Sequence, residues 1–206
     1  MDLKPALLRS HLRMNQPSGS CFPYRIANKV DYVSTALLPK PILDGMQRSY
    51  SISMLWEGTA VNIKVPEERQ LLNLVLPTWQ REFVWTAEQQ RSFVEGIFLG
   101  FGTGFYVVNG REYDGDNDCY MSGWLIDGQQ RITSIARFVK DEFTVFDGIR
   151  YSDLSLGEKR RRFDNVVFPC IELEYQGDEG RLKELYRRLN FGGSAHTNED
   201  LQRIGK

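Results

Sequence analysis

A short polar turn between two apolar segments carries the residues best suited to chemistry. Trp124 to Ile126 are apolar and predict a buried strand, and from Ile132 onward apolar residues recur at the spacing of one helix face. The sequence therefore predicts a strand, a tight turn and a helix. The corner between them is formed by Asp127, Gly128, Gln129, Gln130 and Arg131.

This corner has the chemistry of a phosphate site. The first N–H groups of a helix lack helical partners and carry partial positive charge, so they bind anions. Gly128 permits a close backbone approach, and Arg131 offers planar donors to phosphate oxygens. Asp127 can hold a divalent metal or accept a ribose hydroxyl, and the two glutamines can position a water. The alternative is a solvated corner in which Asp127 only caps the helix.

Composition limits what the rest of the chain can be. The 206 residues are 41% hydrophobic and 12% aromatic, which is enough for a packed core. The net charge of −1 argues against a protein held to DNA by bulk charge, but a local basic face stays open. We expect no membrane association, because no apolar run reaches the roughly 18 residues of a span.

The cysteines and histidines predict no zinc site and no HNH nuclease centre. Cys21, Cys119 and Cys170 form no CxxC pair, and His11 and His196 are the only histidines. An odd number of cysteines without a secretory signal indicates reduced thiols and a cytoplasmic location. We interpret the thiols as buried or incidental.

Two further motifs lie on either side of the corner in the sequence. The first, at residues 76–85, contains Gln80-Arg81 and leads into a helix, because Thr86 and Gln89 form a capping box. The second, at residues 188–193, follows a predicted helix that ends near Leu189. It is a loop with the sequence Arg188-Leu189-Asn190-Phe191-Gly192-Gly193.

In order and spacing, the three motifs resemble the N-terminal domain of the GmrSD type IV restriction endonucleases. That family is similar in fold to ParB partition proteins and sulfiredoxin, and the resemblance covers about residues 70–203. It implies an α+β (mixed α/β) domain of short strands and packed helices at residues 67–206. Residues 1–66 would form a β-rich N-terminal extension.

The resemblance also implies a nucleotide site and hydrolysis of a nucleoside triphosphate with Mg²⁺ or another divalent metal. GTP, CTP or UTP is favoured over ATP. Asp127, Gln130 and Arg131 would be catalytic, with Asp127 also the metal ligand, since phosphoryl transfer needs mainly positioning and charge neutralisation. The nucleotide would be bound by Gln80, Arg81, Gly128, Gln129, Asn190, Gly192 and Gly193. For Gln80 and Arg81 the alternative is a structural ion pair or a helix cap.

Two departures weaken the third motif: His196 lies where the family usually has an aliphatic residue, and Asp200 lies near where Glu is usual. A second function is suggested by the expected absence of the nuclease domain of the full enzymes, by the β-rich N-terminal segment and by a basic run at Lys159 to Arg162. The chain would then be a non-catalytic regulator or inhibitor that binds DNA or protein and keeps the pocket motif. The partners left open are DNA, a protein that supplies nuclease function, and a second copy of the chain. A third hypothesis is nicking of DNA by this domain itself.

A basic run is the candidate contact to nucleic acid. Ser155 and Glu158 predict a helix start, and this helix exposes Lys159, Arg160, Arg161 and Arg162. The run is either a solvated face or a contact to phosphates.

Several weaker patterns complete the prediction. Tyr50 to Leu55 and Val61 to Val65 alternate as half-buried strands. Asp44 to Arg48 echoes the corner, but a strand pattern follows it, so we interpret the echo as coincidence. The acidic loop at residues 109–122 fits a solvated hairpin tip better than a calcium loop. Val166 to Leu173 predicts a strand with Pro169 at an edge or bulge.

Overall fold

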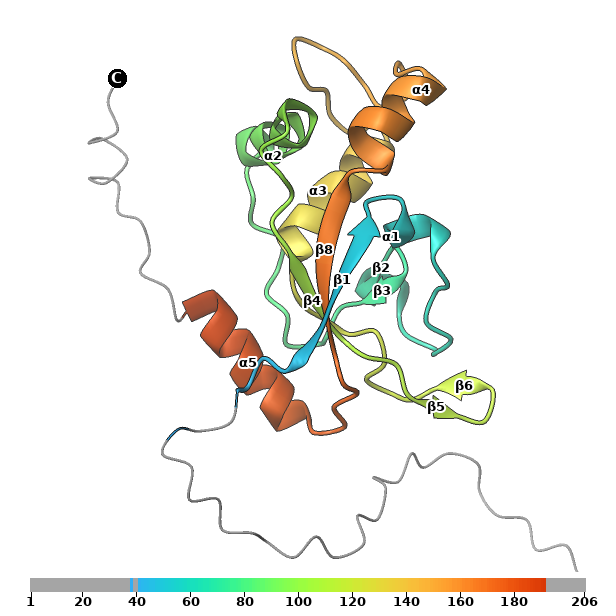
Figure 1. Ribbon diagram of the computed structural model, residues 1–206, viewed down its shortest axis with the longest axis vertical. Coiled ribbons are helices and arrows are strands. Elements are labelled where there is room, and N and C mark those ends of the chain that lie inside the picture. The colour runs from blue at the N-terminus through green and yellow to red at the C-terminus, as the bar shows by residue number, and fades with distance from the viewer. Residues whose placement is uncertain (1–37, 39–40, 192–206) are drawn as a thin grey trace, which may run out of the picture.

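The computed structural model describes Leu38 and residues 41–191 of the chain (Figure 1). Residues 1–37 of the predicted N-terminal extension, which include Cys21, lie outside these residues, as do Gly192, Gly193, His196 and Asp200.

A four-stranded mixed sheet forms the centre of the fold. Its order is β1 (Gly45–Ser51), β8 (Val167–Leu173), β4 (Tyr106–Asn109) and β7 (Leu125–Asp127). β1 runs antiparallel to β8, β8 parallel to β4, and β4 antiparallel to β7. With the helices packed against it, this sheet confirms the predicted α+β class.

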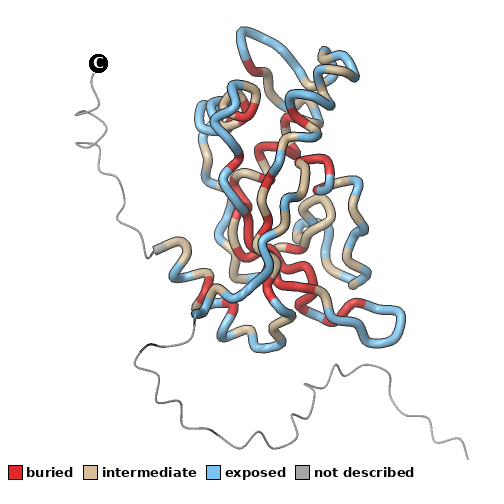
Figure 2. The backbone as a smooth tube through the Cα atoms, in the orientation of Figure 1, coloured by how far each residue is buried: buried red, intermediate tan, exposed pale blue. Residues whose placement is uncertain are grey.

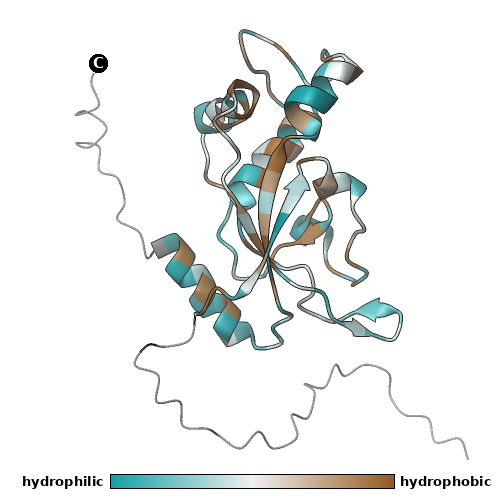
Figure 3. Ribbon diagram, in the orientation of Figure 1, coloured by the Kyte–Doolittle hydropathy of each residue, from teal (hydrophilic) through white to brown (hydrophobic). Residues whose placement is uncertain are grey.

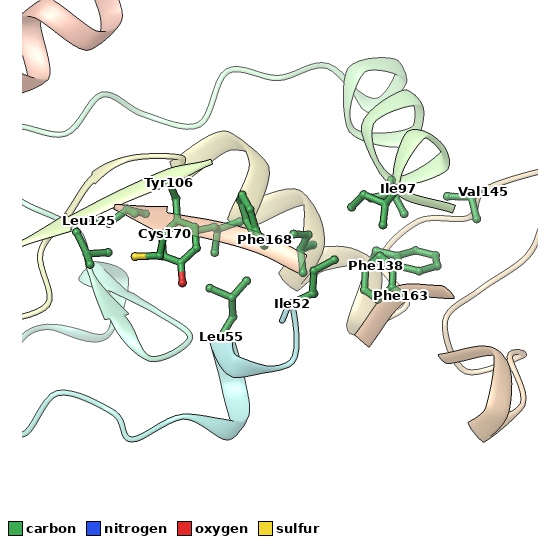
Figure 4. Close-up of a cluster of buried hydrophobic side chains, with 14 residues drawn as sticks. Ile52, Leu55, Ile97, Tyr106, Leu125, Phe138, Val145, Phe163, Phe168 and Cys170 are labelled. Atoms are coloured by element: carbon green, nitrogen blue, oxygen red, sulfur yellow. The ribbon is translucent and has the colours of Figure 1, made fainter. Parts of the chain in front are cut away.

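Helices cover both faces of the sheet because the inner strands carry apolar side chains on both sides. Tyr106 and Val108 face one buried cluster, which includes residues of α1 (Met54–Glu57), α2 (Ala87–Leu99) and α3 (Gln129–Val139). Val107 faces a second cluster, which includes residues of α5 (Glu179–Phe191). Figure 2 shows buried residues along the central strands, and Figure 4 shows the first cluster from Tyr106 to Phe163.

Helix starts follow the predicted capping boxes. At α2, the Gln89 N–H donates to Thr86 Oγ1 over 3.2 Å and the Thr86 N–H donates to Gln89 Oε1 over 2.9 Å. Ser155 and Glu158 form the same pair at α4 (Leu156–Lys159), which continues as the π-helical η2 (Arg160–Asp164). Both predicted boundaries are therefore confirmed.

Short elements fill the remaining loops. η1 (Glu67–Arg69) precedes β2 (Gln70–Leu71) and β3 (Leu74–Val75), and β5 (Tyr113–Asp114) pairs with β6 (Asn117–Asp118). The β5–β6 hairpin confirms the predicted hairpin tip. Among the described residues, no cluster of His, Cys, Asp and Glu side chains is suited to hold a metal ion.

The two predicted strands before residue 66 are wrong in different ways. At Tyr50 to Leu55 the strand stops after Ser51, because the Ile52 and Ser53 N–H groups donate to Val166 and Asp164 carbonyls in the turn into α1. Residues 61–65 do alternate in burial, and Val61, Ile63 and Val65 pack on the second cluster, but they join no strand ladder. An alternating pattern of apolar and polar residues is therefore not enough to predict a strand.

Two details of the sheet also differ from expectation. Pro169 is not at an edge, because β8 lies between β1 and β4; pairing with β4 begins one residue later, at Cys170. β1 precedes residue 67 and yet pairs with β8 along its whole length, from Gly45 to Ser51. The echo of the corner at residues 44–48 lies in this strand, so no helix starts there.

Candidate functional site

The predicted corner forms as a strand, a glycine and a helix. β7 ends at Asp127, Gly128 adopts φ +107°, and α3 begins at Gln129. A Cβ on residue 128 would lie 2.6 Å from Tyr106 Cβ, so only glycine fits. No side chain caps α3, which excludes the alternative that Asp127 serves as its cap. The first N–H groups of the helix are thus not covered by a capping side chain.

A small pocket lies at this helix start. Its volume is about 70 Å³, enough for one phosphate-sized group but far below the roughly 300 Å³ of a typical ligand pocket. Three separate segments of the chain contribute to its wall. The predicted residues that line it are Gln80, Arg81, Asp127, Gly128, Gln129, Gln130, Arg131 and Asn190.

A larger groove adjoins the pocket. Its volume is about 520 Å³, and it runs along residues 68–83 and the first turn of α3. Gln80, Arg81 and Gln129 line both cavities, so they form the boundary between them. The two cavities together have room for a ligand with a small anionic end and a larger body.

Asp127, at the end of β7, is paired with Arg131 in the first turn of α3. Arg131 Nη2 lies 2.9 Å from Asp127 Oδ2 and donates a second hydrogen bond to the Phe105 carbonyl over 2.7 Å. Arg131 Nε is buried and has no partner. The guanidinium is therefore held in place by two bonds from Nη2, and its Nε–H is among the donors that stay unpaired.

Gln130 holds the first motif against α3. Its Oε1 accepts the N–H groups of Val84 and Trp85 over 2.9 and 3.1 Å, and its Nε2 donates to the Glu82 carbonyl over 3.2 Å. These three bonds use both ends of the amide. Gln130 thus positions residues 82–85, and its catalytic role stays a prediction.

Gln80, Gln129 and Arg81 have side-chain polar groups that no described residue pairs. Oε1 of Gln80 and of Gln129 are buried and have no hydrogen-bond partner. Arg81 is exposed at the rim and forms no ion pair within the described part of the chain. The structural ion pair considered for Gln80 and Arg81 is therefore not formed.

The third motif reaches the pocket from α5. Asn190 lies in the helix and not in the predicted loop, and its Nδ2 donates to the Tyr186 carbonyl over 3.0 Å. Tyr186 also lines the pocket, with its ring edge-on to Trp79 at 5.1 Å. Sequence reasoning missed Tyr186, although its place one turn before Asn190 puts both on one helix face. It also left Trp85, another lining residue, out of the site.

The metal ligands in the pocket suit a metal ion that is bound together with a nucleotide. Asp127 supplies the one carboxylate among the lining residues. Mg²⁺ is often held by one or two carboxylates together with substrate phosphates and waters. A metal held by protein side chains alone would need more ligands than the pocket offers.

The basic run is separate from the pocket. Lys159 Nζ lies 4.4 Å from the centre of the Tyr151 ring, and Arg162 donates to the Phe98 carbonyl at the end of α2 over 2.8 Å. Arg160 and Arg161 are exposed. In Figure 1, α4 lies at the opposite end of the fold from α5, which contributes to the pocket. A contact of this run to nucleic acid stays a prediction.

The two described cysteines are buried, as interpreted from the sequence. Among the described residues, Cys119 and Cys170 form no disulfide, and Cys170 lies beside Tyr106 (Figure 4). Burial raises the pKa of the Cys170 thiol to about 12, so it stays neutral at physiological pH. Neither residue lines the pocket.

Comparison with known proteins identifies one family. Residues 66–203, well over half of the chain, match the family described as the GmrSD restriction endonuclease, N-terminal domain. Searches of curated proteins and of solved structures found no match. Among the described residues, no helix is long and apolar enough to cross a membrane.

Proposed function

Because the chain belongs to the family of GmrSD restriction endonuclease N-terminal domains, we propose that it binds a nucleoside triphosphate in the pocket at the start of α3 and hydrolyses it. One observation carries this proposal. Residues from three distant segments, at 80–81, 127–131 and 190, line one phosphate-sized pocket. A solvated corner without a ligand would not require this convergence.

The pocket offers the charges that phosphoryl transfer needs. The uncapped start of α3, Arg81 and the free Nε of Arg131 can neutralise phosphate oxygens. Asp127 would hold a divalent metal, which neutralises further charge when bound. Gln130 keeps residues 82–85 in place, and so fixes the wall next to Arg81.

The biological setting of this activity is part of the proposal. The family description refers to restriction endonucleases, so we place the chain in DNA-directed defence against phage or in its counter-defence. Nucleotide turnover would then control a partner that acts on DNA, either a protein with nuclease function or a second copy of the chain.

A second candidate is nucleotide binding without hydrolysis. It is favoured by the 2.9 Å pair between Asp127 and Arg131, because a carboxylate engaged by arginine is not free to hold a metal. Hydrolysis requires this pair to open when the nucleotide and its metal enter. A chain in which the pair stays closed would act as a regulator.

The test measures phosphate release and binding separately. We expect GTP, CTP or UTP with Mg²⁺ to release phosphate and to raise the melting temperature, because a ligand that binds only the folded state stabilises it. Asp127→Asn should abolish release and retain a melting shift, whereas Asp116→Asn, at the exposed β5–β6 tip, should change neither. A shift without release in the unaltered chain supports the second candidate. If no triphosphate shifts the melting temperature, nucleotide binding is wrong.

A further inference from the structure

Two amide oxygens at the boundary between the pocket and the groove lack a hydrogen-bond partner. They are Oε1 of Gln80 and Oε1 of Gln129, and both are buried. The Gln129 residue is only 8% exposed. Both residues line the pocket and the groove. Buried polar atoms in native proteins are nearly always paired, so a ligand in these cavities could supply the missing donors.

The type of these atoms determines which part of a nucleotide they fit. Phosphate oxygens accept hydrogen bonds, so they need donors such as Arg131 Nε and the first N–H groups of α3. The Gln80 and Gln129 oxygens are acceptors and need an O–H or N–H group. In a nucleotide, the O–H donors nearest the phosphates are the ribose hydroxyls.

The sizes of the two cavities agree with this assignment. The pocket of about 70 Å³ takes one phosphate group, and the groove of about 520 Å³ has room for a nucleoside. Leu71, Pro77 and Phe83 give the groove an apolar wall that suits a base. The sugar, which links base and phosphate, then falls at the boundary, against Gln80 and Gln129.

We propose that Gln80 and Gln129 bind the ribose hydroxyls, so that the site selects ribonucleotides over deoxyribonucleotides. This inference rests on the proposed nucleotide binding and names the substrate class for that site. A deoxyribose leaves one buried oxygen unpaired, and a site built to bind a substrate hydroxyl rejects the analogue that lacks it. The expected discrimination is about tenfold to hundredfold for each missing hydroxyl.

The experiment compares sugars on the full chain. GTP, CTP and UTP, each with its 2′-deoxy and 3′-deoxy form, are titrated by calorimetry. In the unaltered chain, at least one deoxy form should bind about tenfold to hundredfold more weakly. Gln129→Leu and Gln80→Leu should each weaken the ribonucleotide by that factor and leave the corresponding deoxynucleotide almost unchanged.

Controls separate this inference from its premise. Gln47→Leu, an exposed glutamine of β1, should leave all affinities unchanged, and melting temperatures show whether each variant folds. Equal affinity for ribose and both deoxy sugars in the unaltered chain overturns the inference but leaves nucleotide binding intact. A preference for ribose over deoxyribose that survives in both variants also overturns the inference. Slower turnover with an unchanged sugar preference overturns it too, because the amides would then position a water. If no nucleotide binds, both proposals fail.

Discussion

The pocket beside α3 and the basic run of α4 and η2 are both predicted phosphate sites, and their polar groups differ in one respect. In the basic run, Lys159 lies over Tyr151 and Arg162 bonds to the Phe98 carbonyl, so two of four cations have structural partners. In the pocket, buried atoms of Gln80, Gln129 and Arg131 have none. Unpaired buried polar atoms, and not clustered charge, are therefore what the pocket has and the basic run lacks.

The largest expected effect tests whether the corner depends on close packing. Gly128→Ala should destabilise the fold by about 2–5 kcal/mol, because it adds backbone strain and overpacking at once. The new Cβ would lie 2.6 Å from Tyr106 Cβ. Gly148 is the matched control, since it also has positive φ but no atom within 4 Å of a Cβ. Urea unfolding should show a loss of only about 1–2 kcal/mol for Gly148→Ala; equal losses would remove the role of the Tyr106 contact.

The next effect compares one arginine from each region. Arg131→Ala should weaken nucleotide binding about tenfold to hundredfold, because it removes a charged donor from a largely buried site. Arg160→Ala, on the exposed face of η2, should change affinity less than about twofold. Calorimetric titration of both variants checks this. Similar losses for the two would show that long-range charge, and not the pocket, attracts the nucleotide.

A smaller effect sharpens the distinction between a positioning and a ligand-binding glutamine. Gln130→Leu should destabilise the fold by about 1–3 kcal/mol, because the Val84 and Trp85 N–H groups lose their acceptor. Gln89→Leu removes an exposed acceptor from the Thr86 N–H and should cost about 0.5–1 kcal/mol. Hydrogen exchange at Val84 and Trp85 should accelerate in the first variant alone. Unchanged exchange there would contradict the positioning role.

The smallest effect concerns Cys170, which is buried but has Tyr106 as a partner. Its folded pKa of about 12 lies above the ordinary value of 9.0, so at high pH the unfolded chain loses this proton first. Stability should therefore fall by about 1 kcal/mol from about pH 8 to pH 10, and less in Cys170→Ala. Urea unfolding at the two pH values measures the difference. A slope that is identical in the variant would assign the loss to other groups.

Local signals predicted the helix starts and the corner well. The Thr86 and Ser155 boxes and the Gly128 turn depend on neighbours in sequence, and the structure forms all three. The Asp127–Arg131 pair joins two residues only four positions apart, but Asp127 ends β7 and only Arg131 lies in α3, so helix spacing alone does not predict the contact. We predicted separate roles for the two side chains, with Asp127 binding a metal and Arg131 binding phosphate, and did not predict their contact.

Other features depend on contacts between distant segments. Residues 61–65 alternate because one side packs on the second cluster, and nothing local reveals that no strand pairs with them. The bonds of Gln130 to residues 82–85 span more than 40 positions. Likewise, the hydrogen-bond partners of Gln80 and Gln129 depend on the tertiary structure around them and cannot be predicted from neighbouring residues.

The helix at the end of the described chain has a simpler pattern. In Figure 3, α5 alternates hydrophilic and hydrophobic bands, and its apolar residues Leu182 and Leu185 pack on the second cluster. The sequence predicted a helix that ends near Leu189, and the structure forms it as far as Phe191. The same helix carries Tyr186 and Asn190 to the pocket.

The pairing of β1 with β8 has a consequence for any shortened form of this protein. The family match begins at residue 66, after β1 has already covered one side of β8. A fragment trimmed to that boundary would leave the backbone amides and carbonyls of an interior strand bare along seven residues. Such an edge recruits strands from neighbouring molecules, so the trimmed fragment should aggregate more readily than the longer chain.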